Sequence, residues 1–224
     1  MTPKTFHART GTVKFWRLAV MAEAPCCANF SYRMTTKPER TRWLQALATS
    51  LVLVLMVALL HAQGRMFLCA CGYFAVWTSD TCSATNSQQL FDPYSFTHLL
   101  HGVLFFWLIA LFFGRLAKGW QFWLALLLES AWEVFENTSF VINKYRTETA
   151  ALGYQGDTVV NSLGDLACAL VGYLIARQIG FRRSLILFLL IELVLILWIH
   201  DSLLLQILML VRPVEAIKAW QMCR

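Results

Sequence analysis

Long apolar runs follow one another along most of the chain. They are Leu44–Leu60, Leu99–Phe113, Trp120–Leu128 continuing to Phe135, Val159–Ile179 with polar interruptions, and Leu185–Ile199. A membrane-spanning helix needs roughly 17–25 mostly apolar residues, and five spans fit this pattern. A sixth apolar piece, Leu203–Val211, is too short to cross a membrane alone. The pattern therefore predicts an all-α integral membrane helical bundle of about five to six transmembrane helices.

The composition agrees with a membrane location. Of the 224 residues, 58% are hydrophobic and only 14% are charged, whereas a soluble domain carries about 25% charged residues. The net charge of +6 would indicate nucleic acid only if the basic residues gathered on a soluble face. Because they flank apolar runs instead, we expect membrane lipids and no nucleic acid as partners. The sequence does not indicate an oligomeric state.

The basic residues predict the orientation. Three clusters border the apolar runs: Arg33, Lys37, Arg40 and Arg42, then Arg115 and Lys118, then Arg177, Arg182 and Arg183. Positive loops mark the cytoplasmic side, and alternation of the spans puts all three clusters there. We therefore predict a multi-pass membrane protein with a cytoplasmic N-terminus, and the resemblance described below implies the bacterial inner (plasma) membrane. The loops 61–96 and 138–157 would then face outward.

The two ends of the chain lie outside the predicted bundle of residues 43–212. Residues 1–42 would form a cytoplasmic N-terminal segment. Its first 33 residues lack the apolar centre of a signal peptide, and they are either disordered or precede a true start at Met34. Residues 213–224 would form an amphipathic tail, because Pro213 breaks the last apolar piece. The tail lies outside if the fifth run is the last crossing, and a sixth crossing would reverse this.

Three cysteines, Cys69, Cys71 and Cys82, fall in the first outward loop, where oxidation is expected. The CAC spacing is weak evidence for zinc, which prefers pairs separated by two to four residues. The sequence leaves open a disulfide from Cys82 to Cys69 or Cys71, and equally free thiols.

Ionisable residues interrupt the apolar runs at helical spacing. Glu129, Glu133 and Glu136 lie at i, i+4 and i+7, so they share one face of the third run. A carboxylate at bilayer depth costs about 2.5–3.5 kcal/mol, so this face does not contact lipid. His98 and His101 lie at i and i+3 near the start of the second run and also share a face. Two runs therefore carry polar faces that need a protein partner.

The fourth run begins with a third polar face. Asp157, Asn161 and Asp165 are spaced by four, and Gly164, Cys168, Gly172 and Ala176 continue along the helix at the same spacing. Small residues at this spacing let helices approach closely, so the polar face is also expected to be the packing face. The predicted topology puts all three polar faces in the outer half of the membrane. We therefore expect one polar pocket there.

The pocket residues predict a set of roles. The candidate catalytic residues are Glu129, Glu133, Asp157 and Asp165, the candidate substrate-binding residues are Asn137, Tyr145, Arg146 and Asn161, and the candidate metal ligands are His98, His101 and Glu133. Imidazole together with carboxylate suits a divalent metal such as Zn, Mn or Fe.

Structural alternatives stand beside these roles. Glu136 and Asn137 would then emerge at the membrane interface, Thr97 or Ser95 would cap a wet helix start at the two histidines, Asp157 would be an N-cap, and Arg146 would be either a partner of the carboxylates or a solvated charge.

The same residues allow three functions. A metal-activated water, or a carboxylate and histidine acting as acid and base, would make an envelope enzyme that processes lipid. A proton- or ion-coupled carrier uses the same residue types. In a non-enzymatic envelope or assembly factor, the polar cluster would only hold the helices together. The sequence leaves open whether the protein is an enzyme, and we favour the first function.

Five segments carry a resemblance. They read GRMFLCACGYFAVW, NSQQLFDPYSFTHLLHG, ESAWEVFENTSFVINKYR, GYQGDTVVNSLGDLACALVG and HDSLLLQILMLVRPVEAIKAWQ, in this order. The chain thereby resembles, over roughly residues 64–221, an uncharacterised bacterial family of multi-pass inner-membrane proteins defined by a domain of unknown function. The resemblance implies an integral plasma-membrane protein and no established activity. It adds Asp92 and Asp201 to the polar positions, and the chain departs from the pattern at Gln89, His200 and Ser202. A shorter similarity, through Asp157, Asn161 and Gly164, links it to VanZ-like membrane proteins.

Overall fold

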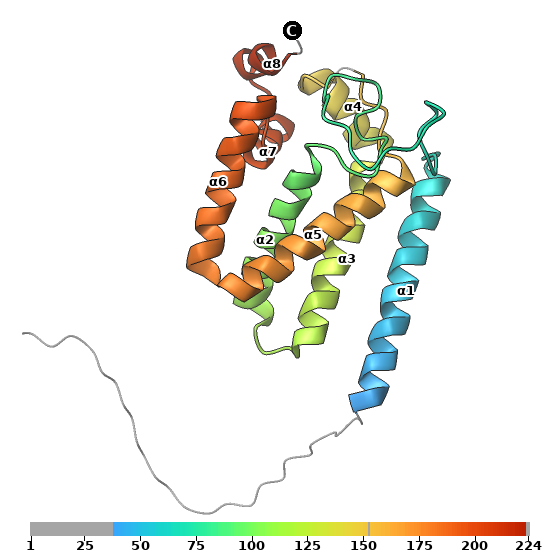
Figure 1. Cartoon of the computed structure of the whole chain (residues 1–224), viewed down its shortest axis with the longest axis vertical. Helices are drawn as coiled ribbons and strands as arrows, with labels where there is room; N and C mark the ends of the chain where they lie inside the picture. Colours follow the sequence, from blue (N-terminus) through green and yellow to red (C-terminus); the bar gives the residue numbers. More distant parts are fainter. Residues whose placement is uncertain (1–37, 152, 223–224) are drawn as a thin grey trace, which may run out of the picture. The chain divides into compact units, whose positions relative to one another are not determined.

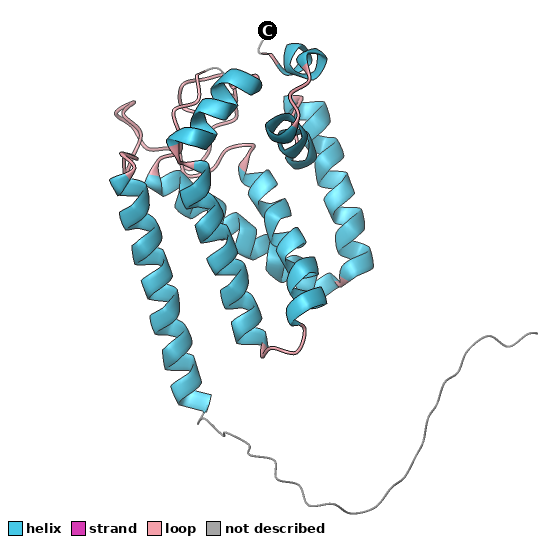
Figure 2. Cartoon of the chain, turned by 180° about the vertical axis from the view of Figure 1, so that it is seen from behind, coloured by secondary structure: helices cyan, strands magenta, loops and turns pink. Residues whose placement is uncertain are grey.

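The computed structural model describes residues 38–151 and 153–222. These residues form eight helices: α1 (Pro38–Ala62), α2 (Ser95–Phe113), α3 (Lys118–Glu136), α4 (Ser139–Glu148), α5 (Val159–Ile179), α6 (Phe181–Ile199), α7 (Leu203–Val211) and α8 (Glu215–Gln221) (Figure 1). Within these residues, loops join the helices and no strand is present (Figure 2). The prediction of an all-α fold is confirmed. The predictions for residues 1–33, Met34 and Lys37 lie outside the described residues.

Among residues 38–151 and 153–222, the candidate membrane spans number three or four, fewer than the five to six predicted. Arg40–Ala62 of α1, all of α2 and all of α5 are long and apolar enough to cross a membrane. Helices α6 and α7 qualify only as one pair, bent by 75° between them. Although α3 is as long as α2, its three glutamates leave no uninterrupted apolar stretch of spanning length. The periodicity therefore located the helices correctly but overestimated how many of them are apolar enough to span.

The outward faces of the apolar helices are consistent with a membrane protein. On α1, the side chains of Leu47, Leu51 and Val54 are each 65–68% exposed. Helix α6 likewise exposes Ile186 and Leu197. Soluble proteins rarely expose continuous apolar faces of this length.

Helices α2 and α5 form the most extensive helix contact. A β-carbon at Gly102 of α2 would overlap the backbone of Ala169, and one at Gly172 of α5 would overlap the carbonyl oxygen of Leu99. Gly164 approaches the loop before α2 in the same way. The small-residue packing face predicted for the fourth run is therefore confirmed, and glycine is required where the two backbones meet.

The connections gather at two opposite ends of the bundle. The start of α1 and the α2–α3 and α5–α6 connections, which carry the predicted basic clusters, lie toward the lower end of Figure 1. Helix α4, helix α8 and the loop between α1 and α2 lie at the upper end. Helix α7 contacts α4, and Lys218 of α8 donates a hydrogen bond to the carbonyl of Thr147 at the end of α4. The tail therefore lies at the end where α6 finishes, and the alternative of a sixth crossing by Leu203–Val211 is wrong.

The loop between α1 and α2 is tied to the helices beneath it. Gln89 is 1% exposed, and its side-chain oxygen accepts a hydrogen bond from the backbone nitrogen of Ala75 at 2.7 Å. Trp77 stacks on Trp198 at the end of α6 with ring centroids 6.2 Å apart. The loop also contains a disulfide that joins the two cysteines of its CAC sequence, at positions 69 and 71. For Cys69 and Cys71, both predicted alternatives, a disulfide to Cys82 and free thiols, are therefore wrong.

The close contact of α2 and α5 gives the first test. Substitution Gly172→Ala should lower the thermal stability of the detergent-solubilised protein by roughly 1–3 kcal/mol, because its β-carbon overlaps the backbone of α2. Scanning fluorimetry measures the change. Gly153→Ala is the matched control, because a β-carbon there meets no atom within 4 Å. Equal melting temperatures for the two variants would contradict the packing described.

Candidate functional site

Two histidines of α2 face two glutamates of α3 in the protein interior. The Nδ1 atom of His98 lies 2.6 Å from Oε1 of Glu129 and 3.1 Å from Oε1 of Glu133. The Nδ1 atom of His101 lies 3.2 Å from Oε2 of Glu129. Both glutamates are completely buried, and His98 is 6% exposed. The faces predicted from the spacing of these residues do meet, so the predicted convergence of these four side chains is confirmed.

Helix α5 adds a third carboxylate. Oδ2 of Asp165 lies 3.8 Å from Nε2 of His98, and its Oδ1 accepts a hydrogen bond of 2.6 Å from Ser95. His98 therefore has carboxylates of α3 on one ring nitrogen and a carboxylate of α5 on the other. One turn before Asp165, the amide nitrogen of Asn161 donates to the carbonyl of Gln89 at 2.9 Å. The predicted polar face of the fourth run thus joins the same cluster.

The cluster is closed at its loop end by α4 and the segment before α5. The Tyr145 hydroxyl donates to Oε1 of Glu136 at 2.8 Å. Asn137 exchanges two hydrogen bonds with Asp157, one with its side chain at 2.8 Å and one with its backbone nitrogen at 2.7 Å. The Tyr154 hydroxyl donates to the other carboxylate oxygen of Asp157 at 3.0 Å. Since Glu136 is 8% and Asn137 1% exposed, the alternative that they emerge at an interface is wrong.

Two capping alternatives are also wrong. The N-cap of α5 is Thr158, whose hydroxyl accepts from the backbone nitrogen three residues later, and not Asp157. The N-cap of α2 is Tyr94, which makes no side-chain cap, so neither Thr97 nor Ser95 caps that helix. Asp157 is therefore free of a helix-capping role and belongs to the polar cluster.

Arg146 lies beside the cluster without neutralising it. Its Nε donates to the backbone carbonyl of Tyr154, and Arg146 forms no ion pair with a carboxylate among the described residues. It is half-buried, so it is not a fully solvated charge either. Arg146 is therefore neither a partner of the carboxylates nor a solvated charge, and its side chain instead binds the backbone of the segment before α5.

The loop before α2 also contributes a buried carboxylate to the cluster, which the spacing of residues in the sequence did not predict. Asp92 is 1% exposed and accepts hydrogen bonds from the backbone nitrogens of Ser87 at 2.9 Å and Tyr94 at 2.8 Å. Burial raises the pKa of the Asp92 carboxyl, while these hydrogen bonds oppose the increase. The resemblance had included Asp92 among the polar positions, and that was the only signal for it. Ser95, which the sequence analysis considered only as a helix cap, donates to Asp165 of α5, and the backbone carbonyl of Gln89 accepts from Asn161 of α5.

The cluster holds far more negative than positive charge. Its six buried carboxylates are Asp92, Glu129, Glu133, Glu136, Asp157 and Asp165. In the described part of the chain, their ion pairs are with the two histidines alone, and the remaining ion pair is Lys144–Glu148 at the surface. With both imidazoles protonated, six carboxylates against two cations would still leave four negative charges. Additional protons or a bound cation must compensate for them.

Buried acceptor atoms without a hydrogen-bond partner also indicate that the cluster takes up protons or a cation. Both carboxylate oxygens of Glu133, Oε2 of Glu136 and Oδ1 of Asn161 are buried without a hydrogen-bond partner among the described residues. Oε1 of Glu133 is close to His98 but lacks hydrogen-bonding geometry. A buried acceptor without a donor costs about 1–3 kcal/mol, and more if charged. Acceptors in excess of donors suit a metal cation.

In the part of the chain that the structure describes, two overlapping sets of residues could hold a metal ion. One set is His98, His101 and Glu129, and the other is His98, Glu133 and Glu136. In each set the candidate ligand atoms lie within 4.8 Å of one another. The predicted set had combined the two histidines with Glu133. Instead Glu129 lies with the histidines, because it is the residue of α3 that reaches both rings.

The pKa of Asp157 generates the second test. Burial and the charge of Glu136 raise the pKa of this carboxyl from 3.8 to about 7, although hydrogen bonds from Asn137 and Tyr154 oppose the increase. A raised pKa favours the protonated form in the folded state, so this contribution to stability is complete below pH 3.8 and is lost as the pH rises through about 7. The loss should be of order 2–4 kcal/mol by pH 8. Melting temperatures from pH 4 to pH 8 should fall less for Asp157→Asn than for the unchanged protein. Parallel profiles would show that Asp157 stays ionised throughout.

A known protein family and several known proteins match most of the chain. The family described as "Protein of unknown function (DUF2585)" matches residues 60–223. A UPF0314 protein of Brucella anthropi is 35% identical over 192 residues, which cover 85% of this chain and 97% of that protein. A UPF0314 protein of Rhizobium meliloti is 39% identical over 183 residues, covering 82% and 93%. One from Novosphingobium aromaticivorans is 39% identical over 189 residues, covering 82% and 94%.

No solved structure gives a significant match. The resemblance to an uncharacterised bacterial family is confirmed, and the similarity to VanZ-like proteins stays a prediction. Because the family match covers residues 60–223 and the relatives align over most of their own length, the chain belongs to the DUF2585 family.

Proposed function

We propose that this protein is a metal-dependent enzyme of the membrane that processes a lipid-linked substrate of the cell envelope. The observation that carries the proposal is the convergence of His98, His101 and Glu129 beside unpaired carboxylate oxygens of Glu133. A divalent ion such as Zn, Mn or Fe suits imidazole and carboxylate ligands. It would also compensate for much of the buried negative charge.

A purely structural role accounts less well for the cluster. Polar groups that only hold helices together are expected to satisfy one another, because each buried group without a partner weakens the fold. Glu133 is completely buried and both its oxygens lack hydrogen-bond partners. Such an arrangement fits a site that receives a ligand, here a cation, better than a finished helix–helix contact.

The surrounding residues suit distinct roles in hydrolysis. Asp165 faces the ring nitrogen of His98 opposite to Glu129, and a carboxylate in this place orients a metal-bound histidine. We assign Glu133 as the general base that takes a proton from water. The resulting hydroxide adds to the ester of the substrate, the ester bond breaks, and the proton passes to the leaving oxygen, so that one water is consumed. A bound metal would polarise the water and the ester oxygen.

We also propose the location. The basic clusters lie at one end of the bundle, and α4 and the loop before α2 lie at the opposite end. With the positive ends in the cytoplasm, the N-terminus would be cytoplasmic, and the cluster would lie in the outer half of a bacterial inner membrane. The substrate would then reach the site from the outer leaflet.

Metal content provides the third test. The protein purified in detergent without chelator should contain near-stoichiometric Zn, Mn or Fe by elemental analysis. The double variant His98→Ala/His101→Ala should lose it, because both imidazole ligands are gone. His61→Ala is the matched control, since His61 is exposed at the end of α1.

The isosteric Glu129→Gln gives a second variant if the double variant does not fold. It removes a charged ligand and keeps the shape of the side chain. Thermal melting shows whether each variant is folded. The same metal content in the unchanged protein and in folded Glu129→Gln, or no metal in the unchanged protein, would refute the proposed centre. In the second case, flux of protons or ions in vesicles would test the carrier function instead.

A further inference from the structure

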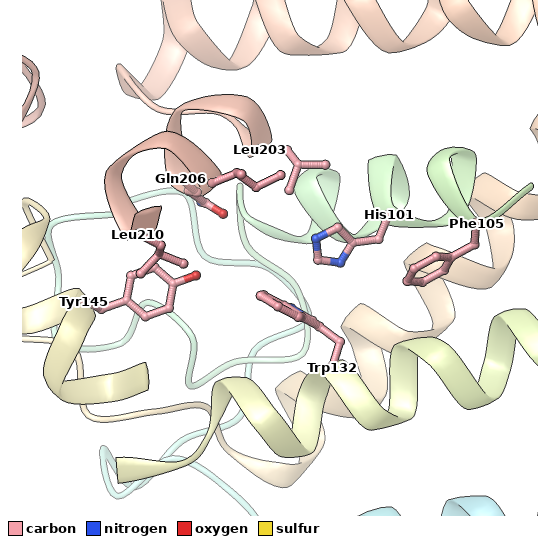
Figure 3. Close-up of a pocket in the computed structure, with 8 residues that line it drawn as sticks. His101, Phe105, Trp132, Tyr145, Leu203, Gln206 and Leu210 are labelled. Atoms are coloured by element: carbon pink, nitrogen blue, oxygen red, sulfur yellow. The ribbon is translucent and has the colours of Figure 1, made fainter. Parts of the chain in front are cut away.

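An apolar cavity of about 170 Å³ adjoins the cluster. Its walls come from four helices, and its lining residues are His101, Phe105, Trp132, Tyr145, Leu203, Gln206, Ile207 and Leu210 (Figure 3). Six of these eight are leucine, isoleucine, phenylalanine, tryptophan or tyrosine, and only His101 and Gln206 are not. The cavity is therefore suited to hydrocarbon more than to water or a sugar.

The polar side of the cavity is the outer wall of the candidate metal centre. His101 lines the cavity, and its Nδ1 lies 3.2 Å from Glu129. Tyr145 lines it as well, and its hydroxyl donates to Glu136 at 2.8 Å. A group bound in the cavity would thus lie against two side chains that each contact a carboxylate of the cluster.

Helix α7 forms the other side of the cavity. Two hydrogen bonds hold the start of this helix in place. The backbone nitrogen of Leu205 donates to the hydroxyl of Ser202 at 3.4 Å. The backbone nitrogen of Leu204 donates to a carboxylate oxygen of Glu192 at 3.3 Å. Ile207 lines the cavity and is 45% exposed, so the mouth reaches the protein surface. On the same helix, Leu208 and Val211, which do not line the cavity, are 40% and 79% exposed. The opening therefore lies in an apolar surface of the kind that contacts lipid.

We infer that this cavity binds the hydrocarbon chain of a membrane lipid, with the polar group of the lipid directed toward His101 and Tyr145. The inference rests on the proposed function, to which it adds the class of substrate. A dry apolar cavity of about 150 Å³ holds a six-carbon ring, so this one takes a chain segment of roughly six carbons next to the polar group. The rest of the chain leaves through the mouth beside Ile207 into the surrounding lipid.

Photo-crosslinking tests this inference. The probes are dodecyl phosphate and farnesyl phosphate, each carrying a diazirine in the chain, incubated with the whole protein in lipid nanodiscs. Peptide mass spectrometry then locates the adducts. We expect labelling of α2 and α7 at residues that line the cavity, such as Phe105 and Leu210. The probe with the higher yield identifies an unbranched or an isoprenoid chain.

The variant Leu210→Trp fills the cavity, and it should reduce this labelling by roughly tenfold. Leu208→Trp is the matched control on the same helix, because Leu208 is exposed and does not line the cavity. Ile207→Trp, placed at the mouth, replaces Leu210→Trp if that variant does not fold. Equal labelling in the filled and control variants, or labelling confined to the outer faces of α1 and α6, would overturn the inference.

Elemental analysis of the same samples separates the two proposals. The variants Leu210→Trp, Leu208→Trp and Ile207→Trp should all keep the metal of the unchanged protein, because none of these positions belongs to a ligand set. Cavity-specific labelling in a protein without metal would support the lipid site and refute the proposed metal centre. Metal retained without cavity-specific labelling would refute the lipid site alone.

Discussion

The burial of six carboxylates around two imidazoles is the constraint on which the described structure depends. Groups of this kind cannot face lipid without a large cost in free energy, so α2, α3 and α5 must turn their polar faces toward one another. His98 lies at the centre of this arrangement, with Glu129 and Glu133 of α3 on one ring nitrogen and Asp165 of α5 on the other. Helix α2 packs against both α3 and α5, so that one base meets acids on two helices.

Close backbone packing makes that arrangement possible. Gly102 and Gly172 allow α2 and α5 to touch along their length, and only at that separation can Ser95 of α2 donate to Asp165 of α5. The hydrogen bond that the Asn161 side chain of α5 donates to the backbone carbonyl of Gln89, in the loop before α2, depends on the same approach. The glycines and the polar cluster therefore depend on each other. The close packing at the glycines sets the distance between α2 and α5, and this distance allows the polar side chains of the two helices to form hydrogen bonds.

The polar cluster adjoins an exposed apolar surface at the cavity beside α7. His101 and Tyr145 belong to both, since each lines the cavity and each contacts a carboxylate of the cluster. The bend between α6 and α7 creates this meeting point by turning a short apolar helix back over the polar residues. A substrate with a hydrocarbon chain and a polar end would find both surfaces it needs within one helix turn of α2.

Helical periodicity in the sequence determined a great deal: the positions of five long helices, the shared faces of Glu129 with Glu133 and of His98 with His101, and the small-residue face of α5. These are local properties, because side chains at i+3 and i+4 share a face whatever surrounds the helix. The burial of Asp92, the contact of Tyr145 of α4 with Glu136 and the choice of Glu129 as the partner of both histidines were decided only by the tertiary structure. Each depends on the rotation and the height of one helix relative to another, and no spacing within a single helix encodes those two quantities.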